Sequence, residues 1–200
     1  FEVACCPPNM TRFLPSLPGY IYATKDDVVF VNLFIAGSGS FDLGGRAVAI
    51  AQETRYPWDG AVKLTVSPDK AGPFELAVRV PGWARGEAMP TDLYRFLDAA
   101  VDAPVLKVNG EALSLDIRDG YARIRRDWTS GDTVELTLPM PVRRIVANDA
   151  VAEDRGRVAL QRGPLVYAVE GVDNGDRVFS LVLPDAASLS AEFRPGLLNG

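Results

Sequence analysis

Histidine is absent from this 200-residue sequence, and cysteine occurs only twice. Without histidine the chain cannot build a Ser-His-Asp or Cys-His catalytic arrangement from its own residues, and it lacks the commonest metal ligand. Any chemistry carried by these residues must therefore use cysteine, carboxylates or tyrosine.

Long hydrophobic runs and an excess of positive charge are also missing. The longest apolar run, residues 28–36, contains Asn32 and is far shorter than the roughly 20 residues of a membrane-spanning helix. No signal-peptide pattern opens the chain. The net charge is −5, and lysine and arginine are scattered, so no basic stripe faces a phosphate backbone. We therefore expect neither a membrane nor a nucleic-acid partner.

What the sequence does contain is apolar residues in strand-like patterns. An apolar content of 48% suffices for one large or two small domains with a core and no disulfides. Residues 20–36 are predicted to form a hairpin that turns at KDD, and residues 46–67 a second hairpin that turns at PWDG. Residues 74–80 are predicted to form a further strand. Later turn signals at Asn109-Gly110, Asp119-Gly120 and Ser130-Gly131 separate short alternating strands. This pattern predicts an all-β fold, a β-sandwich of antiparallel strands.

A few segments depart from the strand pattern. Residues 7–20 are predicted to form a short helix that Pro15 and Pro18 stop. Residues 91–103 have helical spacing and are predicted to form one helix inserted between strands. Residues 37–45 are predicted to be a flexible loop, and the prolines that flank Met140 mark the best internal boundary.

The two cysteines, Cys5 and Cys6, are adjacent and precede two prolines. Neighbouring Cα atoms lie about 3.8 Å apart, below the roughly 4.4–6.8 Å of a relaxed disulfide, so a bridge between them would be strained. Two small buried apolar residues are one interpretation. A metal site or a reactive thiolate is a second one, because the prolines hold the pair rigid. Two thiolates supply half of a tetrahedral zinc shell, and bound zinc would keep a nucleophilic thiolate without a histidine.

Four blocks resemble glycoside hydrolase family 127, the β-L-arabinofuranosidases: CCPPNMTRFLPSLPGYIYAT, QETRYPWDGAVKLTV, FELAVRVPGWA and GRVALQRGPLVYAVEGVDN. In that family a helical (α/α)6 barrel carries the active site and β-sandwich domains follow it. The resemblance implies that residues 1–19 end the barrel, 20–141 form a β-sandwich and 142–200 form a second β-rich segment. It agrees with a chain that starts at Phe1 without Met, which we expect to be part of a longer protein.

The resemblance also implies a site. Cys5 corresponds to the nucleophile, which forms a glycosyl thioether in a retaining mechanism, and Cys5 and Cys6 both ligate Zn2+. The remaining ligands, a glutamate and a cysteine, lie upstream in the family, as does the glutamate that acts as acid and base. We therefore expect a saccharide substrate for the parent enzyme and no activity for these 200 residues alone. Unpaired thiols favour a reducing compartment, which predicts a cytoplasmic location.

Other residues allow more than one interpretation. Trp58, Trp83 and Trp128 could stack on sugars, but such residues more often pack in cores or turns. Arg12 could offset thiolate charge, touch substrate or form a salt bridge. Gly163-Pro164 reads as structural, and the 26 carboxylates read as solvated surface. Two other functions stay open: a non-catalytic β-sandwich for carbohydrate binding or scaffolding, and a thiol metal or redox site unrelated to sugars.

Overall fold

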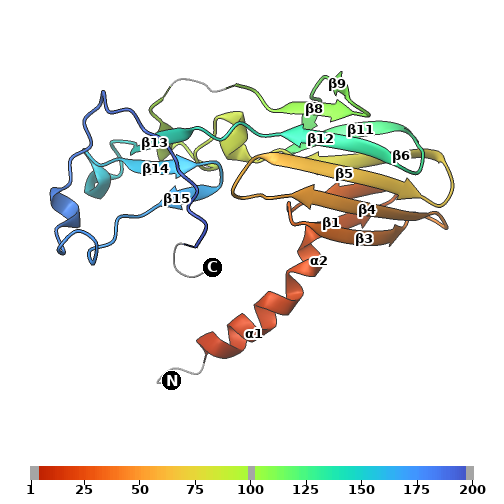
Figure 1. Cartoon of the computed structure of the whole chain (residues 1–200), viewed down its shortest axis with the longest axis horizontal. Helices are drawn as coiled ribbons and strands as arrows, with labels where there is room; N and C mark the ends of the chain where they lie inside the picture. Colours follow the sequence, from red (N-terminus) through yellow and green to blue (C-terminus); the bar gives the residue numbers. More distant parts are fainter. Residues whose placement is uncertain (1–4, 99–101, 197–200) are drawn as a thin grey trace. The chain divides into compact units, whose positions relative to one another are not determined.

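The computed structural model describes residues 5–98 and 102–196 and divides the chain into two compact units (Figure 1). The first unit comprises residues 1–81 and 104–138, and the second comprises residues 82–103 and 139–200. The chain thus enters the second unit twice. The predicted division into residues 20–141 and 142–200 assigns one continuous segment to each domain, and it stays a prediction. None of the helices in the described ranges has both the length and the apolarity needed to cross a membrane.

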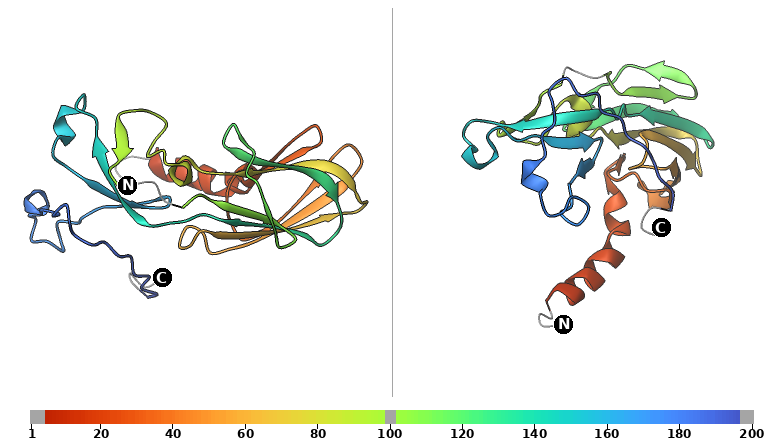
Figure 2. Two further views of the ribbon diagram at one scale, coloured as in Figure 1. Left: turned by 90° about the horizontal axis from the view of Figure 1, so that it is seen from above. Right: turned by 60° about the vertical axis from the view of Figure 1, so that its left-hand side comes forward.

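The first unit is a β-sandwich, as predicted, and its two sheets form the layers seen in Figure 2. One sheet has the order β1-β2-β6-β11-β10 and the other β3-β4-β5-β12-β8-β9. Their strands are β1 (Tyr22–Lys25), β2 (Val28–Val31), β3 (Gly37–Asp42), β4 (Ala47–Thr54), β5 (Ala61–Pro68), β6 (Gly72–Arg79), β8 (Val105–Val108), β9 (Glu111–Leu113), β10 (Ile117–Arg118), β11 (Tyr121–Trp128) and β12 (Asp132–Thr137).

Alternation of apolar and polar residues places one face of each central strand in the core. In β5 the residues Val62, Leu64, Val66 and Pro68 are buried, and the residues between them are exposed or half-buried. The predicted hairpins β1–β2 and β4–β5 are confirmed by their antiparallel registers. Trp128 is fully buried at the end of β11, and its indole N–H donates to the Phe74 carbonyl over 3.1 Å. A period of two along the strands therefore determines which side chains build this core.

One pair of neighbouring strands, β2 and β6, runs parallel, in a sandwich predicted to be antiparallel. The chain leaves β2, forms β3, β4 and β5 in the opposite sheet, and returns to the first sheet as β6. A parallel neighbour requires such a crossover and cannot be reached by a tight turn. Short-range turn signals do not report this connection.

The prediction of a loop at 37–45 is wrong for residues 37–42, which form strand β3. This strand pairs with β4 along its whole length, from Gly37 opposite Gln52 to Asp42 opposite Ala47. Gly39 is required for packing, because a Cβ there would lie 2.8 Å from the Phe41 ring and 2.9 Å from the Tyr22 ring. Glycine thus marks the close approach of two aromatic rings rather than a flexible segment.

The second unit contains a four-stranded sheet of order β15-β14-β13-β7. Its elements are the 3-10 helix η1 (Gly82–Arg85), β7 (Tyr94–Phe96), β13 (Val142–Ala147), η2 (Ala152–Asp154), β14 (Ala159–Arg162), β15 (Leu165–Tyr167) and η3 (Val178–Ser180). Gly163 turns the chain between β14 and β15 with φ of 56°. Gly163-Pro164 is therefore structural, as predicted.

The predicted inserted helix at 91–103 is wrong where the segment is described, and residues 99–101 lie outside the described residues. Tyr94–Phe96 form β7, which pairs with β13 from Ile145 to Ala147. Tyrosine and phenylalanine suit a pleated, half-buried surface, and sheet hydrogen bonds to β13 replace those of a helix. Tertiary pairing therefore overrides the helical spacing of the apolar residues.

Two helices precede the sandwich: α1 (Cys6–Ser16) and α2 (Pro18–Ile21). The prediction that Pro15 stops the first helix is wrong, because α1 continues through Pro15 to Ser16. Pro18 opens α2, which ends where β1 begins. The Ile21 carbonyl accepts hydrogen bonds from the Asn32 and Leu33 amides, so α2 is fastened to the loop after β2.

Candidate functional site

The first turn of α1 positions the two cysteines. Cys5 is the N-cap residue with helical backbone angles (φ −68°, ψ −35°), and Cys6 is the first residue of the helix. Pro7 and Pro8 follow, where the missing proline N–H has no helical acceptor to lose and the fixed φ suits a helix. The Cys5 carbonyl accepts a 3.3 Å hydrogen bond from the Asn9 amide. Both cysteines are thus held by a rigid first turn.

The two sulfur atoms lie on the same side of this turn, 3.7 Å apart. Both thiols are free and exposed. A disulfide would bring the sulfurs to about 2.05 Å, so the pair is in non-bonded contact. Two thiolates on one tetrahedral zinc ion, each with a Zn–S distance of about 2.3 Å, are separated by about 3.8 Å. The spacing of this pair therefore fits two corners of a zinc tetrahedron.

Among residues 5–98 and 102–196, no cluster of three cysteine, aspartate or glutamate side chains could hold a metal ion. The cysteine pair therefore offers two ligands, and a structural or catalytic zinc site needs at least one more protein ligand. Arg12 is exposed on the same helix, and the ion pairs of the described residues do not include it. Of the three roles considered for Arg12, the salt bridge is not formed within the part of the chain that the structure describes.

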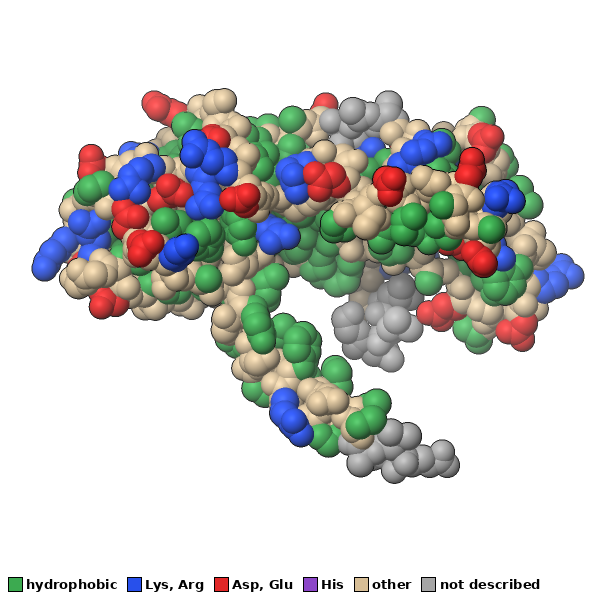
Figure 3. Space-filling view, turned by 180° about the vertical axis from the view of Figure 1, so that it is seen from behind, with side chains coloured by type: hydrophobic (Ala, Val, Ile, Leu, Met, Phe, Trp, Pro, Cys, Tyr) green, Lys and Arg blue, Asp and Glu red, His purple; other side chains and the backbone are tan. Residues whose placement is uncertain are grey.

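Helix α1 exposes an apolar surface. None of its residues is buried, and Met10, Phe13 and Leu14 are each more than half exposed. Figure 3 shows hydrophobic side chains along the projecting helix. An 11-residue helix without a packed face is marginal on its own in water. The helix that carries the cysteines thus has a surface suited to packing against other polypeptide.

The tryptophans occupy three different environments. Trp128 is a core residue, as the packing interpretation predicted. Trp58 lies in the β4–β5 turn with about half of its surface exposed, and Trp83 lies on η1 in the second unit beside Phe96 and Arg143. Each tryptophan is therefore described by its own surroundings, and of the three only Trp58 is classed as exposed.

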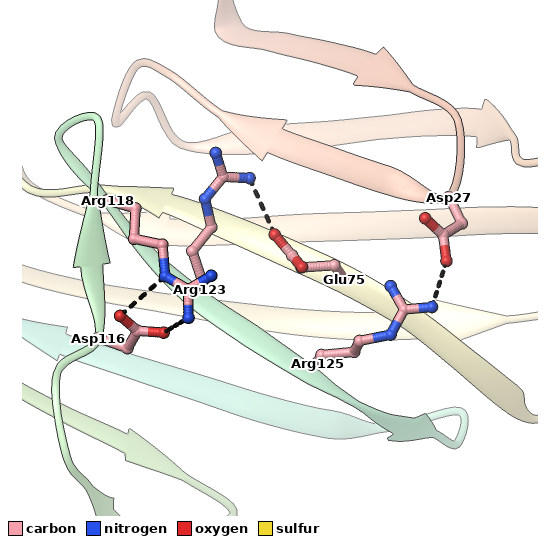
Figure 4. A network of polar contacts seen from close by, with 6 residues as sticks. All are labelled: Asp27, Glu75, Asp116, Arg118, Arg123 and Arg125. Atoms are coloured by element: carbon pink, nitrogen blue, oxygen red, sulfur yellow. Dashed lines mark hydrogen bonds and ion pairs between the residues drawn. The ribbon is translucent and has the colours of Figure 1, made fainter.

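Charged groups on one face of the first sheet form ion pairs rather than an acid/base pair of carboxylates (Figure 4). Glu75 pairs with Arg123 over 2.8 Å and Asp27 with Arg125 over 2.6 Å. The hydrogen bond from Arg125 lowers the pKa of Asp27. The Arg123 guanidinium also lies 5.0 Å from the centre of the Phe30 ring. These contacts agree with the expectation that the carboxylates act as solvated surface.

Two adjacent arginines of β13 carry a feature that sequence reasoning missed. Arg143 is buried against the Phe96 ring, with its guanidinium carbon 3.4 Å from the ring centre, and burial lowers its pKa. Its Nε and Nη1 atoms, and the Nε atom of Arg144, are buried without a hydrogen-bond partner among the described residues. Arginine is hardly ever buried without partners, and nothing in the letters PVRRI signals this burial.

Comparison with known families covers nearly the whole chain. Residues 28–140 match the family described as "Beta-L-arabinofuranosidase, GH127 middle domain", and residues 142–197 match "Glycoside hydrolase family 127 C-terminal domain". Residues 1–27, which include the cysteine pair, precede both matches.

Individual proteins show the same likeness. A non-reducing end β-L-arabinofuranosidase of Bifidobacterium longum subsp. longum is 35% identical over all of this chain, which spans 29% of that protein. The crystal structure of a GH127 β-L-arabinofuranosidase from Geobacillus stearothermophilus T6 is 45% identical in sequence and has a TM-score of 0.87. The match covers 99% of this chain and 29% of that protein. Another GH127 β-arabinofuranosidase structure is 43% identical with a TM-score of 0.82, and 86% of this chain covers 27% of it. The chain therefore spans less than a third of these relatives.

Proposed function

This chain belongs to glycoside hydrolase family 127, and from that premise we propose that it is the C-terminal part of a retaining glycosidase that acts on β-L-arabinofuranosides or related sugars. The matched regions are called middle and C-terminal, which supports the proposal that the complete enzyme also has an N-terminal domain. The substrate proposal draws on the printed names of the relatives.

Cys5 is the proposed nucleophile of the complete enzyme, and Cys5 and Cys6 are proposed to hold a zinc ion. The observation that supports this is the 3.7 Å separation of the two sulfur atoms on a rigid helical turn. Bound zinc would keep both cysteines deprotonated at neutral pH, as thiolate ligands require. The other ligands and the acid/base residue would come from the N-terminal domain.

The proposed reaction has two displacements at the anomeric carbon. In the first, the Cys5 thiolate forms a C–S bond, the glycosidic C–O bond breaks, and the acid outside this chain protonates the leaving oxygen. In the second displacement, the residue that acted as the acid now acts as a base and takes a proton from water, and the water oxygen attacks the anomeric carbon. The C–S bond then breaks and the thiolate is regenerated. Two inversions give net retention.

The role of Cys6 differs from that of Cys5 in this scheme, because only one sulfur can lie in line with the bond that breaks. Cys6 holds the metal and thereby fixes the orientation of Cys5. These 200 residues alone are proposed to lack hydrolase activity, because they bring together neither the acid nor a complete metal shell.

Metal analysis of the complete protein tests the ligand assignment. We expect about one zinc per chain in the wild type and marked loss of zinc in both Cys5→Ser and Cys6→Ser. Hydrolysis of an aryl β-L-arabinofuranoside is expected to fall by about 10⁶-fold in Cys5→Ser, the scale seen when a catalytic nucleophile is removed. Thr11→Ala serves as the matched control, since Thr11 is exposed on the same helix and, within the described residues, its hydroxyl donates to the Pro8 carbonyl. Full zinc content in both cysteine variants would contradict the assignment.

A further inference from the structure

A hollow in the second unit lies beside the arginine pair of β13. It has a volume of about 260 Å3, and Arg144 contributes to its wall. Two nitrogens of the Arg144 guanidinium are occupied, since Nη1 donates to Asp98 over 3.1 Å and Nη2 donates to the Ala187 carbonyl. The Nε atom is buried without a partner among the described residues. Asp98 and the Ala187 carbonyl therefore hold the Arg144 guanidinium in a fixed orientation at the wall of the hollow.

Another part of the wall is formed by the loop of residues 148–157, which makes consecutive turns. Hydrogen bonds run from the Val151 amide to the Asn148 carbonyl and from the Arg157 amide to the Asp154 carbonyl. The Tyr94 hydroxyl of β7 donates to the Asp154 carboxylate over 2.8 Å, and this bond raises the pKa of Tyr94. Asp154 and Arg144 are therefore both oriented by neighbours, which lowers the entropy that a ligand must overcome.

The charges around the hollow balance. Six charged side chains line it: Arg144, Arg155, Arg157, Asp149, Asp154 and Asp185. A phosphate would lie against three carboxylates and a cation against three guanidinium groups. A neutral ligand with many hydroxyl groups can accept hydrogen bonds from the arginines and donate to the aspartates. Leu97, Val146 and Leu183 add an apolar part to the wall, which suits the C–H face of a sugar ring.

We propose that this hollow of the second unit binds one ring of a neutral saccharide. Its volume is just below the roughly 300–1,000 Å3 of pockets for larger ligands, which favours a single ring over a chain. The choice of L-arabinose as the probe rests on the proposed function. The inference that the hollow binds a ligand with hydroxyl groups rests instead on the charged and apolar residues that line it. A single ring held by a few hydrogen bonds binds with a Kd of about 1 mM.

Hydrogen–deuterium exchange of the complete protein, titrated with L-arabinose, tests the site. We expect saturable protection of the peptides that cover residues 144–158 and 183–187. Arg144→Lys keeps the charge but removes the guanidinium that Asp98 and Ala187 hold at the hollow, and it should raise the L-arabinose concentration needed for half-maximal protection at least tenfold. Asp154→Asn should also weaken this protection, and this variant provides a second reading if Arg144→Lys impairs folding. Arg177→Lys is the matched control, because Arg177 is exposed in the same unit and lies outside the hollow.

The outcomes separate this inference from the proposed function. Protection confined to the peptide with Cys5 and Cys6 would overturn the inference and leave the glycosidase proposal intact. Protection by inorganic phosphate but not by L-arabinose would also overturn it, in favour of an anion site. Saturable protection of 144–158 in a protein without hydrolase activity would support the second site while contradicting the glycosidase proposal.

Discussion

The sandwich and helix α1 differ in how far their apolar side chains are exposed to water. In the sandwich, Leu64, Leu76 and Trp128 are essentially inaccessible to water, and every central strand buries one face. In α1, Met10 and Phe13 are more than half exposed, and no residue is buried. The sandwich has its own hydrophobic core, whereas α1, which carries the cysteines, has no buried face within the described residues.

This difference indicates where each part obtains its stability. A core of this kind supports a folded unit by itself, because burial of apolar surface is the main favourable contribution. Helix α1 needs a partner surface to gain the same contribution. This chain spans only 29% of the length of two of its relatives. We therefore propose that an N-terminal domain of the complete enzyme provides the surface against which α1 packs. The cysteine pair would then be buried at the junction of the two.

The largest expected effect concerns the core. Trp128→Ala removes a fully buried indole and its hydrogen bond to Phe74. We expect the free energy of unfolding of the 200-residue chain to fall by about 3–5 kcal/mol. Urea denaturation followed by circular dichroism measures this. A change below about 1 kcal/mol would mean that Trp128 does not pack as described.

An intermediate effect depends on which protein is measured. Phe13→Ala in the 200-residue chain should change the free energy of unfolding by less than about 0.5 kcal/mol, because the side chain is exposed there. In the complete protein the same substitution should cost about 2–4 kcal/mol if α1 packs into the N-terminal domain. Equal effects in the two proteins would remove the contrast between α1 and the sandwich.

A smaller effect depends on pH. Asp132 accepts hydrogen bonds from the Asn109 amide group over 2.8 Å and the Thr129 backbone N–H over 2.9 Å. Burial raises its pKa, but these bonds and Arg126 together outweigh burial, so the pKa is lower than usual. A lowered pKa stabilises the fold above the ordinary value of about 3.9, and this contribution is lost as the pH falls through the folded-state pKa.

We therefore expect Asp132→Asn to cost about 1–2 kcal/mol at pH 7 and progressively less below pH 4. Denaturation at a series of pH values measures this. Asp116→Asn is the control, since Asp116 forms an exposed ion pair with Arg118 and should change stability by less than about 1 kcal/mol at any pH. A cost that is independent of pH would show that the hydrogen bonds do not favour the charged carboxylate.

The sequence predicted the parts of the fold that local patterns determine. The hairpins at β1–β2 and β4–β5 follow from alternating apolar residues around short turns, and the structure confirms both. It did not predict β3 or β7, because a glycine-rich segment and a segment with helical spacing each became a strand through pairing with a distant partner. The parallel pairing of β2 with β6 depends on a crossover that no local signal reports.

The candidate site was predictable to a similar extent. Two adjacent cysteines before two prolines indicated a rigid thiol pair, and the structure adds their 3.7 Å separation and their position at the start of a helix. The burial of Arg143 and of the Arg144 Nε atom could not be predicted, because it depends on strands and loops that come together only in the folded unit.

Identification of the residue that becomes glycosylated tests the central proposal most directly. The complete enzyme would be incubated with a slow or inactivating β-L-arabinofuranosyl substrate, digested, and analysed by peptide mass spectrometry. The proposed mechanism predicts one pentosyl group on the sulfur of Cys5 and none in the Cys5→Ser variant. A pentosyl group on Cys6, on a carboxylate, or on a residue of the N-terminal domain would contradict it.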